Sequence, residues 1–185
     1  MRLTVKAFTS LLFLVFAIAC SNPKKTGQIN EDQLPHQLVK KLTNIIVVDI
    51  FSPPVATRIY ANTSIALYEA IRFNEEGSAS ISAKLKGFEA MPVPEKGKTY
   101  NFSIAAIQSF CETAKKVTFS APEITKYQDS IIAVYASGLD EEVVKQSIAF
   151  GQQVADVVAT QANTAFSFDW FTDVTQHVGD AGVTV

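Results

Sequence analysis

The stretch SPPVATRIYANTSIALYEAIR, from Ser52 to Arg72, contains the residue whose side chain is best suited to binding or catalysis. This residue is Arg58, a lone arginine that follows a pair of prolines and is surrounded by alanine and isoleucine. An exposed guanidinium there could bind an anion. The alternative, which we favour, is that the stretch begins a core helix and that Arg58 pairs with a carboxylate of a neighbouring helix. Further along the same stretch, Glu69 and Arg72 are three residues apart and should form a surface ion pair.

The other reactive residue types are scattered along the chain. His36 and His177 have no metal-binding partner three or four residues away, so we expect no metal site. Cys111 lies in a helical pattern, which favours a buried structural thiol. We find no glycine-rich phosphate loop, no Gly-x-Ser-x-Gly motif and no cysteine–histidine pair at a catalytic spacing.

The composition indicates one compact domain. The chain has 185 residues, of which 48% are hydrophobic, and this is enough to build a core. Its formal net charge is only -2, and it has no basic run, so we expect no nucleic-acid partner.

The first residues predict export and a lipid anchor. Arg2 and Lys6 precede a short apolar run that ends in Ala-Ile-Ala-Cys, which resembles a bacterial lipobox. Residues 1–19 are therefore predicted to be a lipoprotein signal peptide and Cys20 the lipid attachment site, although an ordinary signal peptide is the alternative. Residues 20–33 are polar and predict a flexible tether. The predicted location is therefore the bacterial cell envelope, where the lipid would attach the protein to a membrane. The absence of an acidic run after Cys20 favours the periplasmic face of the outer membrane.

The elements that must position these residues are helices. Helical periodicity predicts segments at 34–50, 52–73 and 101–118, a helix from 120 to Gly138, and a helix over 141–163 capped by Asp140. Ser52 should be the N-cap of the second segment, and Ser120 with Glu123 should form a capping box. The run IIVVDIF could also be a buried strand, but helix is favoured. The expected inward-facing residues include Leu38, Leu42, Ile45, Ile46, Ile59, Thr63, Leu67, Ile104, Ile107, Phe110, Ile131, Val134, Gly151, Val154 and Val158.

The segments between and beyond these helices are irregular. Phe88–Thr99 holds two prolines and a glycine, which predicts a loop, and ISAKLKG before it predicts a short helix ended by Gly87. Residues 164–185 have no helical stripe and form a divergent tail. We therefore predict an all-α fold, an irregular bundle of about five helices, with its helical domain at 34–163.

The sequence also resembles a known family. The Pro-Pro, arginine and Ala-x-Tyr-Glu-Ala pattern is similar to the helix-starting signature of vanadium-dependent haloperoxidases and their relatives in the type-2 phosphatidic acid phosphatase superfamily. The matching residues are Pro53, Pro54, Arg58, Ala66, Tyr68, Glu69 and Ala70. SIAFGQQVADVVATQA resembles a later family helix, with Gly151 at its tight-packing position. KGFEAMPVPEKGKTYNF resembles the lipoprotein branch of Bacteroidetes-like bacteria. The resemblance covers about residues 38–163 and only the N-terminal half of the family.

The resemblance implies a helical protein whose pocket binds vanadate or phosphate. In the family that pocket comes from C-terminal motifs: a lysine and arginine before a proline, a Pro-Ser-Gly-His, and a Ser-Arg with a following histidine. These motifs are absent, and Arg58 and Arg72 are the only arginines after the signal peptide. We therefore predict no catalytic, cofactor-binding or metal-binding residue in this chain. Vanadate or phosphate is expected only in full-length family members.

Two functions follow as hypotheses. The first is the N-terminal helical half of a haloperoxidase- or acid-phosphatase-like lipoprotein, inactive by itself, with a missing C-terminal half or a second copy as its partner. The second is a non-catalytic, membrane-anchored helical lipoprotein that binds a partner through exposed apolar surface.

Overall fold

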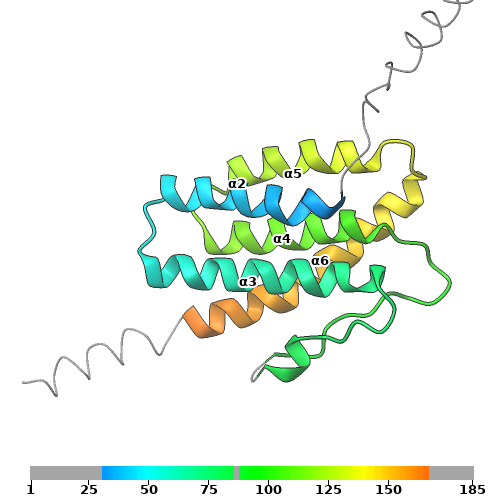
Figure 1. Cartoon of the computed structure of the whole chain (residues 1–185), viewed down its shortest axis with the longest axis horizontal. Helices are drawn as coiled ribbons and strands as arrows, with labels where there is room; N and C mark the ends of the chain where they lie inside the picture. The colour runs from blue at the N-terminus through cyan, green and yellow to red at the C-terminus, as the bar shows by residue number, and fades with distance from the viewer. Residues whose placement is uncertain (1–30, 86–87, 167–185) are drawn as a thin grey trace, which may run out of the picture. The chain divides into compact units, whose positions relative to one another are not determined.

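The computed structural model describes residues 31–85 and 88–166, and the regular structure within these ranges is entirely helical (Figure 1). The five longer helices are α2 (Leu34–Val48), α3 (Pro53–Ile71), α4 (Phe102–Val117), α5 (Ala121–Ala136) and α6 (Glu141–Phe166). Short 3₁₀ turns occupy η1 (Glu31–Gln33), η2 (Arg72–Asn74) and η3 (Ser82–Lys84). The all-α prediction is confirmed. The predicted signal peptide and Cys20 lie outside the described residues, as does most of the tail.

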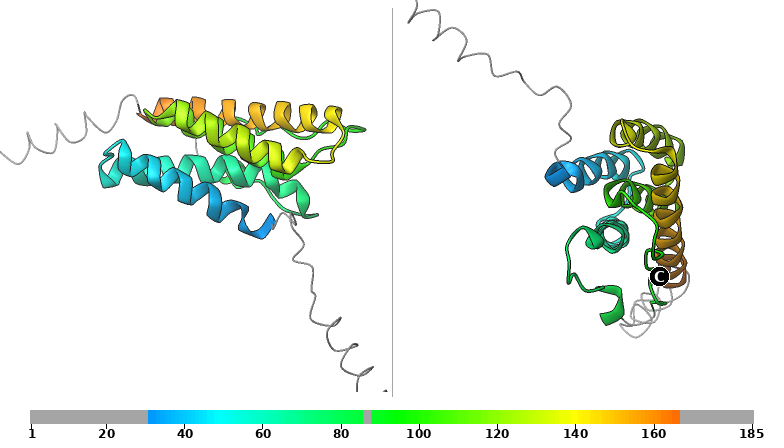
Figure 2. Two further views of the ribbon diagram at one scale, coloured as in Figure 1. Left: turned by 90° about the horizontal axis from the view of Figure 1, so that it is seen from above. Right: turned by 90° about the vertical axis from the view of Figure 1, so that its right-hand side faces the viewer.

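Helix α4 is the centre of the bundle, where α3, α5 and α6 all pack against it (Figure 2). The predicted stripe of Ile104, Ile107 and Phe110 is buried. The other faces of the helix are buried too, because they carry small residues that allow neighbouring helices to approach. These additional buried residues include Ser103, Ala105, Ala106, Ser109 and Thr113. Burial on every face is typical of a helix in the middle of a core.

At Gly151 the helices α6 and α4 come into direct contact. A Cβ atom at this position would lie 2.7 Å from Cβ of Gln108 and closer still to the carbonyl oxygen of Ala105. Real Cβ atoms essentially never come this near to other heavy atoms. Glycine therefore lets the backbone of α6 lie directly on α4, at the tight-packing position that the family resemblance implied.

Asp49 joins two turns that are far apart in sequence, the α2–α3 turn and the α4–α5 turn. Its carboxylate accepts hydrogen bonds from the backbone N–H groups of Phe119 (2.8 Å) and Ser120 (3.2 Å) and from the Ser120 hydroxyl. Burial disfavours the charged carboxylate, but these hydrogen bonds outweigh that cost and lower the pKa of Asp49. The predicted capping box at Ser120 is therefore wrong, because this side chain donates to Asp49 instead of capping its own helix.

The helix boundaries otherwise follow the sequence, with a few differences. Asp140 caps α6 by accepting from the N–H of Glu142 at 2.8 Å, as predicted. Ser52 lies at the N-cap of α3, but its side chain makes no capping hydrogen bond, and Pro54 at the N2 position has no N–H to donate. The choice of helix over strand for IIVVDIF is correct as far as Val48.

Three further details of the sequence prediction need correction. Helix α6 continues to Phe166, beyond the predicted end at 163. The expected short helix before Gly87 is only the 3₁₀ turn η3, and Gly87 itself lies outside the described residues. Val134 was expected in the core, but it is 55% exposed because it lies on the outer face of α5.

The contact at Gly151 predicts that Gly151→Ala destabilises the protein by about 2 kcal/mol, because the new Cβ overlaps the backbone of α4. Helix propensity alone would make the alanine variant more stable by about 1 kcal/mol. The sign of the change in unfolding free energy therefore distinguishes steric overlap from propensity. Urea unfolding followed by circular dichroism measures it. Ala149→Gly, at an exposed position on the same helix, is the control for propensity. A Gly151→Ala variant more stable than the wild type would contradict the close packing.

Candidate functional site

Arg58 lies on the exposed side of α3, about one turn beyond the two prolines. In the described part of the chain, no carboxylate lies within ion-pair distance of its guanidinium. The predicted pairing with a neighbouring helix is therefore wrong. Pro53 and Pro54 are exposed at the start of α3, where their missing N–H groups cost nothing.

Glu69, in contrast, is a fully buried carboxylate near the end of α3. It accepts hydrogen bonds from Nε of Arg72 at 3.0 Å, from the Ser80 hydroxyl at 2.9 Å and from the backbone N–H of Ser82 at 2.9 Å. The predicted pair with Arg72 exists, but it is not on the surface: the two side chains are 0% and 11% exposed. The segment after α3 folds back over the pair and excludes water.

Arg72 and Tyr68 fasten the same segment to α3. The Arg72 guanidinium donates to the carbonyl of Ser78 at 3.1 Å and lies 4.0 Å from the ring centroid of Phe73. The Tyr68 hydroxyl donates to the carbonyl of Ala79 at 2.9 Å. The Tyr-Glu pair of the signature thus holds the segment 78–82 against the helix, which is a structural task.

A cluster of aromatic rings adjoins this region. Phe73, Phe102 and Phe150 lie with ring centroids 5.5–6.1 Å apart, and Tyr100 stacks against Phe102 at 5.7 Å. Offset and edge-to-face arrangements of this kind stabilise a core beyond simple burial. The cluster packs the end of α3 and the start of α4 onto α6.

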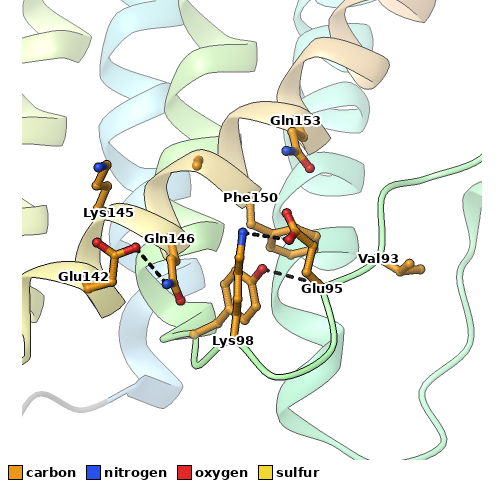
Figure 3. Close-up of a pocket in the computed structure, with 10 residues that line it drawn as sticks. Val93, Glu95, Lys98, Glu142, Lys145, Gln146, Phe150 and Gln153 are labelled. Atoms are coloured by element: carbon orange, nitrogen blue, oxygen red, sulfur yellow. Dashed lines mark hydrogen bonds and ion pairs between the residues drawn. The ribbon is translucent and has the colours of Figure 1, made fainter.

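Beside the cluster is a pocket of about 160 Å³, where the loop before α4 meets α6 (Figure 3). Its apolar surface includes Tyr100 and Phe150, and its lining also contains two lysines and two glutamates. Lys98 pairs with Glu95 at 2.7 Å, and this hydrogen bond raises the pKa of Lys98. Because two cations face two carboxylates, the pocket has no net positive charge and does not suit a highly charged oxyanion. Sequence reasoning missed it, since its residues come from a loop and a helix that no motif connects.

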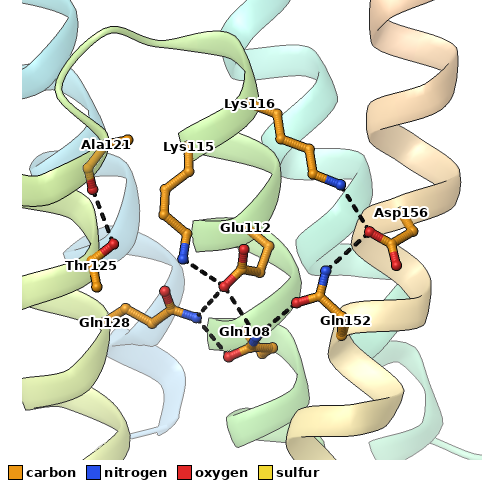
Figure 4. A network of polar contacts seen from close by, with 9 residues as sticks. All are labelled: Gln108, Glu112, Lys115, Lys116, Ala121, Thr125, Gln128, Gln152 and Asp156. Carbon is orange, nitrogen blue, oxygen red and sulfur yellow. Dashed lines mark hydrogen bonds and ion pairs between the residues drawn. The ribbon is translucent and has the colours of Figure 1, made fainter.

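A polar network fastens α5 and α6 to α4 (Figure 4). Gln128 of α5 donates to Gln108 of α4 at 2.6 Å, and Gln108 donates to Gln152 of α6 at 3.1 Å. Both Gln108 and Gln128 are buried. Each of these glutamines bonds a side chain of another helix, so the network joins α5 and α6 to α4.

The charged residues of Figure 4 are paired at the edges of this network. Lys115 donates to Glu112 at 2.6 Å, and Lys116 donates to Asp156 of α6 at 2.8 Å. The hydrogen bond from Lys116 is the main reason why the pKa of Asp156 is lowered. Sequence reasoning did not single out any of these residues, although their polar types on otherwise apolar helices were a usable signal.

Among the described residues, the remaining candidates do not form a reactive centre. Burial raises the pKa of the Cys111 thiol to about 12, so it stays protonated and unreactive, as expected of a structural thiol. His36 is exposed on α2, and His177 lies outside the described residues. Within the ranges that the structure describes, no group of three histidine, cysteine, aspartate or glutamate side chains could hold a metal ion. None of the described helices is long and apolar enough to cross a bilayer.

Comparison with solved structures identifies the class of fold. The chain is similar to a bacterial vanadium-dependent iodoperoxidase, with a TM-score of 0.65 and 32% sequence identity over 71% of this chain. It therefore has a haloperoxidase-like, all-α fold. The chain spans only about a third of that protein, since the match covers 32% of its length. No protein-family model and no curated protein matches the chain.

The burial of Glu69 predicts that Glu69→Gln destabilises the protein by about 3 kcal/mol, because Arg72 would keep its charge in a largely buried place without a counter-ion. Urea unfolding measures the loss, and hydrogen exchange at the Ser82 amide should accelerate with it. Glu75→Gln, at an exposed position just after α3, is the matched control. Equal stabilities of the two variants would show that the buried pair does not hold this segment.

Proposed function

We propose that this chain is the N-terminal helical half of a haloperoxidase- or acid-phosphatase-like lipoprotein, and that it supports an oxyanion pocket whose residues lie elsewhere. The observation that carries the proposal is the partial likeness to the iodoperoxidase: 32% identity, but over only 32% of that protein's length. Membership of the haloperoxidase family is part of the proposal, together with the bacterial lipoprotein branch indicated by the sequence.

The positions of the signature residues support a scaffolding role. Glu69 and Tyr68 hold the segment after α3, while Gly151 permits the contact between α6 and α4. Pro53 and Pro54 begin α3. Each of these residues has a packing or positioning task within this half of the fold, and such a task does not require the residue to touch a substrate.

The distribution of cations supports the absence of a pocket in this half. Binding vanadate or phosphate requires several cationic donors that converge on one point. In the described ranges, Arg72, Lys98, Lys115 and Lys116 are each paired with a carboxylate. Arg58 is exposed and stands apart from these pairs. The pocket beside Tyr100 balances Lys98 and Lys145 with Glu95 and Glu142, so it does not fit vanadate, and we derive no catalytic step through that ion.

The proposal predicts that the purified chain neither binds nor uses vanadate. Vanadium-51 NMR titration should give no saturable binding. Iodide or bromide oxidation with peroxide, and phosphate ester hydrolysis, should not exceed blanks without protein. Arg58→Gln should behave like the wild type, with Lys84→Gln as a matched surface control. Saturable vanadate binding that is lost in Arg58→Gln but kept in Lys84→Gln would contradict the proposal and restore the anion-site interpretation of Arg58.

We further propose that Cys20 carries a lipid that holds the protein on the periplasmic face of the outer membrane. Support comes from the charged start, the short apolar run and the Ala-Cys junction of the sequence. Labelled palmitate should enter the protein in bacterial cells, and Cys20→Ala should abolish this labelling. Cys111→Ala is the control, since its buried thiol should have no part in the reaction. Equal labelling of the wild type and Cys20→Ala would contradict lipidation at this residue.

A further inference from the structure

An apolar surface is exposed at the end of the bundle where the α2–α3 turn meets the α4–α5 turn. We call it the apolar tip, and it consists of Val47, Val48, Ile50 and Phe119. Their exposed fractions are 69%, 69%, 88% and 79%. The ring of Phe119 stacks on Phe51 with centroids 5.0 Å apart, so the two turns form one continuous surface. Large apolar side chains gathered in one exposed place are typical of a surface that something covers.

The tip is held rigidly, not left as a loose loop. Asp49 binds the backbone of the opposite turn, at Phe119 and Ser120. Ile50 has a φ of 57°, in the left-handed region that β-branched residues rarely adopt. The backbone thus keeps an isoleucine in a strained conformation while its side chain points into solvent. Strain that the surrounding contacts maintain is a feature of binding surfaces.

The described chain ends at the same end of the bundle. Helix α6 finishes there, on the side where α2 passes into α3, in both Figure 1 and the left view of Figure 2. Helix α3 packs against both α6 and α2. Axes of packed helices are 8–10 Å apart, so the tip is about 20 Å from the end of α6. The segment 167–185 follows that end, and an extended chain of this length spans about 60 Å.

The composition of the segment 167–185 complements the tip. It contains Phe168, Trp170 and Phe171, which could cover apolar side chains, and it has aspartates but no lysine or arginine. Arg58 is exposed without a described partner, about 8 Å along α3 from the tip. An acidic, aromatic segment therefore begins within reach of an apolar surface with a free cation beside it. We propose that residues 167–185 dock on the apolar tip, with Trp170 or its phenylalanine neighbours on Ile50 and Phe119.

This docking is testable because Trp170 is the only tryptophan in the chain. In the full-length protein, Trp170 fluorescence should be blue-shifted and protected from acrylamide. Ile50→Ser and Phe119→Ser should each lower the ratio of docked to undocked segment by about tenfold, because each removes a large apolar contact. Val134→Ser is the matched control, since this exposed valine lies towards the opposite end of α5. Arg58→Gln should reduce the protection of Trp170 from acrylamide, and the reduction should be larger at low salt than at high salt.

Four results would overturn the proposal. One is a Trp170 quenched as readily as N-acetyltryptophanamide. A second is protection that survives the Ile50→Ser, Phe119→Ser double variant, which would place the segment elsewhere. The third is protection that disappears on dilution, which would mean that a second copy covers the tip. In the fourth, Val134→Ser exposes Trp170 as much as the tip variants do. Circular dichroism of each variant establishes that the helices remain folded. The proposal does not depend on vanadate chemistry, so its failure would leave the proposed function unaffected.

Discussion

The structure depends on one steric constraint, the direct contact between the backbones of α6 and α4 at Gly151. Any side chain at this position would meet the Ala105 carbonyl and Gln108. Because α6 lies so close, Gln152 can reach Gln108 and Lys116 can reach Asp156, and these bonds fix α6 along α4. The contact also places Phe150 of α6 among the rings of Phe73 and Phe102, at the start of α4.

This packing assigns most of the signature residues to the support of the helices. Glu69 and Tyr68 fold the segment after α3 back onto its helix, and Arg72 is neutralised in the process. Lys98, Lys115 and Lys116 are likewise each paired with a carboxylate along or across the helices. A scaffold of this kind can hold the helices of a larger site in place without contributing a reactive group.

The sequence predicted the helices well because their signals are local. Apolar periodicity, the prolines before α3, Asp140 before α6 and Gly138 after α5 all act within one or two turns. The features that the sequence did not predict depend on tertiary contacts. Glu69 and Arg72 have a spacing typical of a surface pair, and only the return of residues 78–82 buries them. Ser120 has the sequence of a capping residue, but Asp49, 71 positions earlier, takes its hydroxyl. The pocket beside Tyr100 joins a loop to α6 in the same non-local way.

Native-state hydrogen exchange tests the central constraint most directly. If the contact at Gly151 organises the bundle, amides of α4 near Ala105 and of α6 near Val154 should be the slowest in the protein. They should exchange only through global unfolding. Amides of α2, which packs more peripherally, should exchange through smaller local openings. The opposite order, with α4 and α6 exchanging through local openings while α2 or α5 is protected to the global limit, would contradict the account.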